Sequence, residues 1–156
     1  MGLLWFNLIM FAFYLPSLIL HEYGHALVGR LIGLRLKSVS IGKGEPFLRI
    51  GHFSVAKKQI WEGLYQPYPT TVPLRRGQRA VLLLGGIFAN FIAGLFVAGL
   101  SQLFPSPVMH LLAPPFIQIS IIFILFNLIP IRLTSGFPSD GLQLKWLFFN
   151  KNSRTD

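Results

Sequence analysis

Three long apolar segments dominate the pattern of hydrophobic and polar positions along the chain. No side chain is charged before residue 21, and a helix over residues 3–20 would rise about 27 Å, close to the hydrocarbon thickness of a bilayer. A second stretch, residues 80–131, contains no Asp, Glu, Lys or Arg, and four prolines interrupt it near its middle. The pattern therefore predicts three transmembrane helices, over about residues 3–33, 80–104 and 116–130. The third is short for a full crossing, so an earlier start or a partly re-entrant course stays open.

The connection between the first two predicted helices has a β-type pattern. Short β-prone stretches occupy residues 38–41, 47–50 and 52–55, and glycines and a proline separate them. We predict a small membrane-associated β-hairpin or sheet, within a loop over about residues 36–72. The fold class is then an α-helical integral membrane protein with three transmembrane helices, built as one domain over residues 1–156.

Composition supports a membrane protein and excludes several other classes. Hydrophobic residues make up 53% of the 156 positions and charged residues only 12%, about half the share typical of soluble domains. A chain this apolar can bury enough surface to fold, so intrinsic disorder is excluded as well. Because there is no Cys, disulfides, thiol nucleophiles and thiolate metal sites are ruled out, and any metal must be held by His and carboxylate.

The positive charge of the chain is concentrated on one predicted side of the membrane. The net charge is +9, and ten Lys and Arg residues lie from Arg30, near the end of the first predicted helix, to Arg79, just before the second, with four more after the third. The connection between the second and third helices has none. The positive-inside rule places the N-terminus outside and the basic loop and C-terminus in the cytoplasm. The basic excess thus reflects topology and contact with anionic lipid, and nucleic acid is not expected as a partner.

A candidate metal motif lies at the cytoplasmic end of the first predicted helix. His21-Glu22-Tyr23-Gly24-His25 is an HExxH sequence, and two His four residues apart on a helix project from one face at a spacing that binds one metal ion. Glu22 can reach a metal-activated water and act as a general base. The alternative is a structural polar cluster, but three ionisable groups in an apolar span are costly unless they are paired or bound to metal.

A catalytic zinc needs a third protein ligand, and six residues are candidates. His110 would lie on the opposite side of the membrane, and Asp156 is the last residue of the chain. The candidates in the basic loop would ordinarily be solvated, although His52 stays open. Asp140 follows the third helix on the cytoplasmic side and is favoured, with a helix N-cap as its alternative role. The full set is His52, His110, Glu45, Glu62, Asp140 and Asp156.

A row of small and polar residues marks one face of the second predicted helix. Gly86, Asn90 and Gly94 are spaced four residues apart within GGIFANFIAG. Small residues allow close helix packing, and a buried Asn can hydrogen-bond across such an interface. A structural role and a direct substrate contact for Asn90 both remain open at this point.

Three motifs in order resemble the site-2 protease family of intramembrane zinc metalloproteases. They are HEYGH, GGIFANFIAG, and NLIP followed by SDG, and the Gly-containing SIGKGEP stretch is also similar to that family. The resemblance covers about residues 15–147. Two features depart from the family pattern, namely extra residues at 132–136 and Ser139 in place of an apolar residue. The chain resembles a minimal, core-only member, which we expect in a bacterial or archaeal cell membrane.

The resemblance implies a fold, a zinc site and an activity. The fold would be a three-helix catalytic core whose zinc lies inside the membrane but is reached by water from the cytoplasm. The zinc ligands would be His21, His25 and Asp140, with Glu22 as the catalytic base, and Asn90 and Asn127 would contact substrate or transition state. We expect one Zn²⁺ per chain.

The expected function is zinc-dependent intramembrane endopeptidase activity, in which metal-activated water cleaves a transmembrane or membrane-adjacent peptide. The alternative is a catalytically inactive relative that acts as a membrane-embedded binding or adaptor protein. Expected partners are the lipid bilayer and the peptide substrate, with a gating or adaptor protein left unidentified. An extended substrate could pair with the β-prone loop by strand addition, and we expect residues 52–55 to form the available edge.

Overall fold

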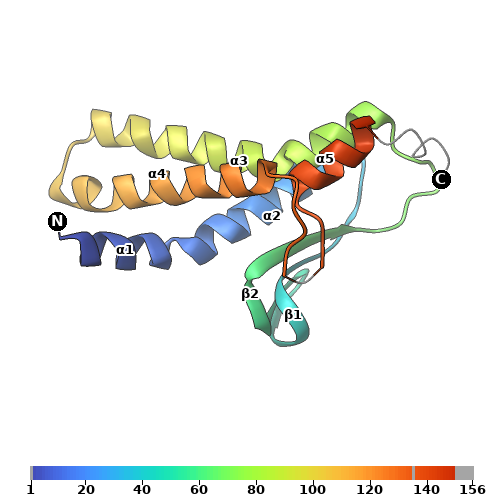
Figure 1. The fold of residues 1–156 in the computed structure, drawn as a ribbon, viewed down its shortest axis with the longest axis horizontal. Helices are drawn as coiled ribbons and strands as arrows, with labels where there is room; N and C mark the ends of the chain where they lie inside the picture. The colour runs from blue at the N-terminus through green and yellow to red at the C-terminus, as the bar shows by residue number, and fades with distance from the viewer. Residues whose placement is uncertain (1, 135, 150–156) are drawn as a thin grey trace.

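The computed structural model describes residues 2–134 and 136–149 of the chain. Long helices run side by side along the longest axis of the molecule, and a two-stranded β-hairpin extends away from them near the end of the second helix (Figure 1). The elements in chain order are α1 (Leu3–Ala12), α2 (Tyr14–Leu31), β1 (Leu36–Ile50), β2 (Phe53–Pro67), α3 (Arg76–Leu103), α4 (Pro107–Leu128) and α5 (Asp140–Phe149).

The three predicted apolar helices are confirmed within the described residues. The segments Leu3–Leu31, Arg76–Leu103 and Pro107–Leu128 are long and apolar enough to cross a membrane, because each contains an 18-residue stretch of high mean hydropathy, 2.0, 2.3 and 2.0 in that order. The first consists of α1 and α2, which join almost continuously at Phe13, whose carbonyl accepts from the Ser17 N–H at 3.0 Å. It ends near Gly33, whose φ of 90° is strained for other residues.

The third helix begins earlier than residue 116, which is one of the alternatives that its short predicted length left open. We expected a proline-containing connection up to residue 115, but α4 begins at Pro107 and includes Pro114 and Pro115. Ser106 caps this helix by accepting the Met109 N–H at 3.2 Å, and proline is well suited to the first helical position, where its missing N–H is not needed. Pro115 is fully buried, so tertiary packing overrides the local helix-breaking preference.

The predicted β-structure between the first two spans is confirmed, with longer strands than expected. β1 and β2 each have 15 residues and pair as an antiparallel hairpin with several register shifts. Because of these shifts, residues 39–41 have partners on both sides. The pairs are Val39 with Tyr65 and Phe53, Ser40 with Leu64 and Ser54, and Ile41 with Gly63 and Val55.

This register overturns the expected edge at residues 52–55. Phe53, Ser54 and Val55 pair with residues 39–41 and also with Ile50, Arg49 and Leu48, so this segment lies inside the sheet. Among the described strands, residues 63–67 of β2 pair on one side only, and residues 46–50 of β1 form the opposite margin. Any strand addition must therefore use one of these two outer segments.

The sheet is joined to the helices through a small apolar core. Ile41 of β1 is fully buried and packs with Leu18 of α2 and with Ile119 and Phe123 of α4. Leu18 lies one turn before the HExxH motif, so this core holds the hairpin beside that motif. The hairpin and the motif are thus parts of one packed unit.

Helices α2 and α3 approach closely within the HExxH motif. A Cβ added to Gly24 would lie 2.5 Å from the carbonyl oxygen of Gly85, closer than real side chains come to backbone. Glycine at both positions therefore lets the two backbones touch at this level. The contact sets the distance between the imidazoles on α2 and the face of α3.

Candidate metal centre

Helix α2 supplies three buried polar side chains from less than two turns. His21, Glu22 and His25 are 3%, 6% and 7% exposed. The imidazoles of His21 and His25 lie with their ring centroids 4.8 Å apart, and their Nε2 atoms are 3.2 Å apart. The helical spacing of the HExxH motif thus brings both Nε2 atoms to one point, as the sequence predicted.

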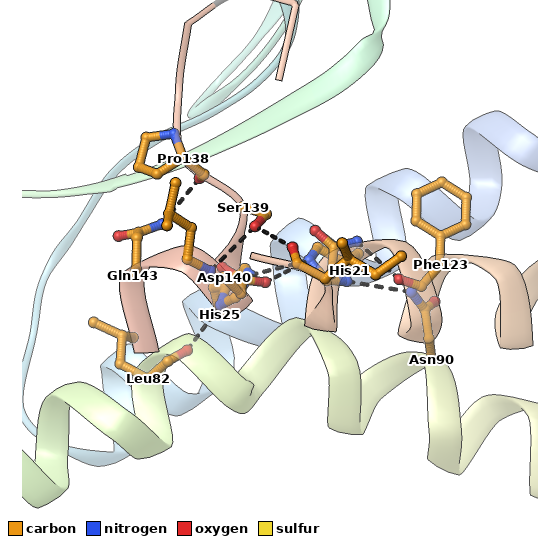
Figure 2. A network of polar contacts seen from close by, with 12 residues as sticks. His21, His25, Leu82, Asn90, Phe123, Pro138, Ser139, Asp140 and Gln143 are labelled. Carbon is orange, nitrogen blue, oxygen red and sulfur yellow. Dashed lines mark hydrogen bonds and ion pairs between the residues drawn. The ribbon is translucent and has the colours of Figure 1, made fainter. Parts of the chain in front are cut away.

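Asp140 joins these two histidines from the start of α5 (Figure 2). Its Oδ2 lies 3.1 Å from Nε2 of His21 and 3.3 Å from Nε2 of His25. Ligands of a tetrahedral zinc, with bonds of about 2.0 to 2.1 Å, are separated by about 3.3 to 3.4 Å. The three atoms therefore have the chemistry and the spacing of three corners of a zinc tetrahedron, and the fourth corner is left for water.

The setting of Asp140 favours the ionised form of its carboxyl group. Burial by itself raises the pKa of Asp140, but hydrogen bonds and charge from His21 and His25 outweigh burial and lower the pKa to about 2. A carboxylate held as an anion next to two imidazole nitrogens is the state that a divalent cation requires.

Ser139 performs the capping role that was the alternative for Asp140. The Ser139 hydroxyl accepts the Leu142 N–H at 3.2 Å, as an N-cap residue does, and donates to the Ile129 carbonyl at 2.7 Å. Gly141 packs against the carbonyl of Leu128 so closely that it leaves no room for a side chain. The Ser-Asp-Gly sequence therefore fixes α5 to the end of α4 and frees the Asp140 side chain to face the histidines.

The extra residues before Asp140 do not displace it. Arg132 and Pro138 form an isolated antiparallel bridge, and the Leu133 N–H donates to the Phe137 carbonyl at 2.7 Å. The Ser139 N–H in turn donates to the Ile131 carbonyl at 2.9 Å. The insertion is thus accommodated by local pairing, and the chain returns to α4 before α5 begins.

Helix α3 contacts both imidazoles from the side opposite to Asp140. The carbonyl of Leu82 accepts the Nδ1–H of His25 at 2.8 Å, which leaves Nε2 of His25 with its lone pair toward the proposed metal position. One turn later, a Cβ on Gly86 would lie 2.5 Å from the His21 ring, so glycine makes room for this imidazole. After another turn, Nδ2 of Asn90 lies 3.3 Å from Nδ1 of His21.

Glu22 points toward strand β2, next to the three candidate metal ligands. A Cβ on Gly63 would overlap the Glu22 carboxylate, and this carboxylate also accepts a hydrogen bond from the Tyr65 backbone. Glu22, His21, His25 and Asp140 all line one cavity of about 310 Å³, together with residues of the β2 edge and of the 133–138 segment. A base, a candidate metal site and space for a peptide therefore occur together.

The remaining candidate residues lie elsewhere. His52 is on the exposed hairpin, where its Nδ1–H donates to the Lys37 carbonyl at 3.1 Å, and Glu62 accepts from Thr134. His110 lies in the first turn of α4, at the far end of the bundle. Glu45 is exposed near the hairpin tip, and Asp156 lies outside the described residues.

The two asparagines differ in position. Asn127 lines the cavity and donates through Nδ2 to the Phe123 carbonyl of its own helix at 2.9 Å. Asn90 is fully buried behind His21. Sequence reasoning missed three residues of the site. Leu82 acts through its backbone, and Gly63 and Tyr65 belong to the site only because of the strand register.

Comparisons with known proteins identify the sequence class. The model of a family described as Peptidase family M50 matches residues 8–112, about two thirds of the chain. This range includes the HExxH motif, the whole β-hairpin and the glycine-rich face of α3. A comparison with curated proteins gave no match.

Proposed function

The chain belongs to peptidase family M50, the site-2 protease family, and we propose that it is an active intramembrane zinc endopeptidase. The observation that carries this proposal is the convergence of His21, His25 and Asp140, with Glu22 beside them in the same cavity. Each of the four residues is less than 9% exposed. Burying this many ionisable groups in a membrane core is costly, and metal binding and catalysis offset that cost.

The proposed zinc ligands are Nε2 of His21, Nε2 of His25 and Oδ2 of Asp140. A zinc ion bound there would supply Lewis-acid chemistry to an attacking water and a peptide carbonyl. The Glu22 carboxylate, held beside the ligands by α2 and β2, accepts the proton of that water and passes it to the leaving amine nitrogen. The burial of all four residues lowers the local dielectric, which strengthens these charge interactions.

The proposal is tested on the full chain purified in detergent. We expect about one zinc per chain by elemental analysis and cleavage of a membrane-spanning reporter peptide. A protein that contains no zinc and cannot be loaded with zinc would contradict the proposal.

We also propose that substrate binds as an extended strand along the edge of β2. A peptide bond within a helix has its backbone hydrogen bonds made, so a helical substrate must unwind before water can attack it. Its freed backbone groups then need new partners. Residues 63–67 of β2 have an unpaired side among the described strands, and Gly63, Leu64, Tyr65 and Pro67 line the cavity that contains Glu22. Strand addition there would bring the peptide next to the base.

Proline substitutions along this edge are expected to reduce cleavage. Neighbouring N–H groups of a strand point in opposite directions, so a scan of Leu64, Tyr65 and Gln66 must include at least one N–H that faces the free side. The outward N–H in this stretch is that of Tyr65, which donates to Glu22 in this structure and would exchange Glu22 for a substrate carbonyl when a peptide binds. Proline at this edge removes that donor, and we expect a loss of cleavage of about tenfold or more with zinc retained.

The matched control is proline at Leu48 and at Arg49, on the opposite margin of the same sheet. These changes are equally severe locally but lie away from the cavity. If every folded, zinc-loaded variant of residues 64–66 cleaved at the rate of the unsubstituted protein, substrate would not bind by strand addition at β2.

Three apolar helices and the family identify an integral membrane protein, and we propose that its active site is reached from the cytoplasm. The charge bias described above supports this orientation. The chain has no native cysteine, so single cysteines can report it directly.

A cysteine at Ser106, before α4, is expected to react with an impermeant thiol reagent added outside intact cells. A cysteine at Lys57, on the exposed hairpin, is expected to react only after the membrane is opened. Labelling of permeabilised cells controls for reactivity of both thiols. The reverse pattern would place the site on the outer side of the membrane.

A further inference from the structure

The buried amide of Asn90 has an unsatisfied atom next to a proposed zinc ligand. Asn90 is 0% exposed, and its Nδ2 lies 3.3 Å from Nδ1 of His21. Its Oδ1 is buried and has no hydrogen-bond partner among the described residues. A buried amide oxygen without a donor costs about 1 to 3 kcal/mol, so such an arrangement calls for a physical reason.

The physical reason depends on which ring nitrogen of His21 carries the proton. Nε2 of His21 faces Oδ2 of Asp140 at 3.1 Å and Nε2 of His25 at 3.2 Å, so Nε2 is the ligand atom of this ring. A neutral imidazole that ligates through Nε2 carries its proton on Nδ1. Nδ1–H and the amide NH₂ of Asn90 would then be two donors facing each other at 3.3 Å.

A half-turn of the Asn90 amide relieves the donor–donor contact and gives Oδ1 a donor, with Nδ2 taking the former place of the oxygen. Amide oxygen and nitrogen have nearly the same shape, so their assignment follows from the hydrogen bonds they can make. With the amide turned, Oδ1 accepts the Nδ1–H of His21, and the orphaned oxygen gains its donor. His25 has the same arrangement: an oxygen, here the carbonyl of Leu82, accepts its Nδ1–H at 2.8 Å.

We propose that Asn90 is a positioning residue for His21, and that its side-chain oxygen fixes the tautomer that leaves Nε2 free to bind zinc. This inference rests on the metal site of the proposed function. Leu82, Gly86 and Asn90 recur every four residues on one face of α3, so that helix orients both imidazoles. Asn90 does not line the cavity of Glu22, so the structure supports this role over direct substrate contact.

The experiment measures the zinc affinity of the full chain by competition with a chelator. Asn90→Leu removes the acceptor at similar volume, and we expect about 10- to 100-fold weaker zinc binding, the range typical of partners that orient metal-bound histidines. Asn90→Asp keeps an acceptor and removes the donor, so zinc binding is expected to stay within about threefold of the unsubstituted protein or to become tighter. Gln118→Leu, which removes an exposed amide from α4, is the matched control and should bind zinc unchanged.

The outcomes separate this inference from the proposed function. If the unsubstituted chain binds no zinc, the proposed function fails. If it binds zinc and Asn90→Leu binds equally well, only the positioning role is overturned. Equal weakening in Asn90→Asp and Asn90→Leu would also overturn it, because the amide would then act as a donor.

A second measurement requires no change at Asn90. Ring ¹⁵N chemical shifts of the zinc-loaded protein, in a His52→Gln and His110→Gln background, report the protonation of His21 and His25 alone. We expect Nδ1 of both rings to carry the proton. An unprotonated Nδ1 on His21 would overturn the proposal even if Asn90→Leu failed to fold.

Discussion

Replacing Glu22 with Gln is expected to reduce peptide cleavage by about 10²- to 10⁴-fold or more while zinc stays bound. Glutamine has the size of glutamate but cannot accept the proton of the attacking water. Glu22 is not one of the three converging ligand residues, and its carboxylate lies against Gly63 and the Tyr65 backbone. The substitution therefore removes the base and leaves the metal site intact.

The measurement combines elemental analysis with cleavage of a membrane-spanning reporter by the same purified sample. Glu45→Gln is the matched control. Glu45 is exposed on the hairpin, so this variant should cleave the reporter at the unsubstituted rate. Cleavage by Glu22→Gln at the unsubstituted rate would refute the role of Glu22. Zinc without turnover in the unsubstituted protein would instead favour a catalytically inactive binding or adaptor protein.

The local part of the candidate site could be predicted because helical geometry alone determines it. His21 and His25 are four residues apart in an uninterrupted helix, so their Nε2 atoms meet without any knowledge of the rest of the fold. Asp140 lies 119 residues from His21. Only its expected side of the membrane and the family resemblance favour it as the third ligand. Its contact with both histidines depends on Ser139 and Gly141, which fix the start of α5 against the end of α4.

The arrangement of the sheet could not be predicted because long-range packing sets it. The β-prone stretches were identified, but the pairing of residues 39–41 on both sides depends on burying Val39 and Ile41. Nothing local to residues 52–55 indicates that they lie inside the sheet. The free edge consequently lies at residues 63–67, which the sequence did not single out.

Backbone groups and prolines also limit what can be predicted from the sequence. The carbonyl of Leu82 orients His25, and a carbonyl group has no sequence signature because every residue has one. Pro114 and Pro115 are strong local signals for a helix end, yet α4 continues through them. In a membrane span, the packing of neighbouring helices decides where a helix begins.

Loss of any one of the three converging residues is expected to abolish stoichiometric zinc binding. His21→Ala, His25→Ala and Asp140→Ala each remove one of three ligand atoms that lie 3.1 to 3.3 Å apart. Two remaining ligands cannot hold zinc against a chelator as three can, and the Asp140 variant also loses the negative charge of the site. Elemental analysis after dialysis against a chelator measures the effect, and His52→Ala and His110→Ala are controls that keep a full zinc complement.

The order of zinc losses across the variants tests the whole arrangement. The ligand variants should lose zinc completely, and Asn90→Leu should bind zinc about 10- to 100-fold more weakly. Variants of the two distant histidines should bind zinc with unchanged affinity. Bound zinc also stabilises the folded state in proportion to its affinity, so the increase in Tm on adding zinc should fall in the same order. Full zinc occupancy in both His21→Ala and His25→Ala would mean that the metal lies elsewhere. Loss of zinc in His52→Ala would move the third ligand to the hairpin and remove Asp140 from the site.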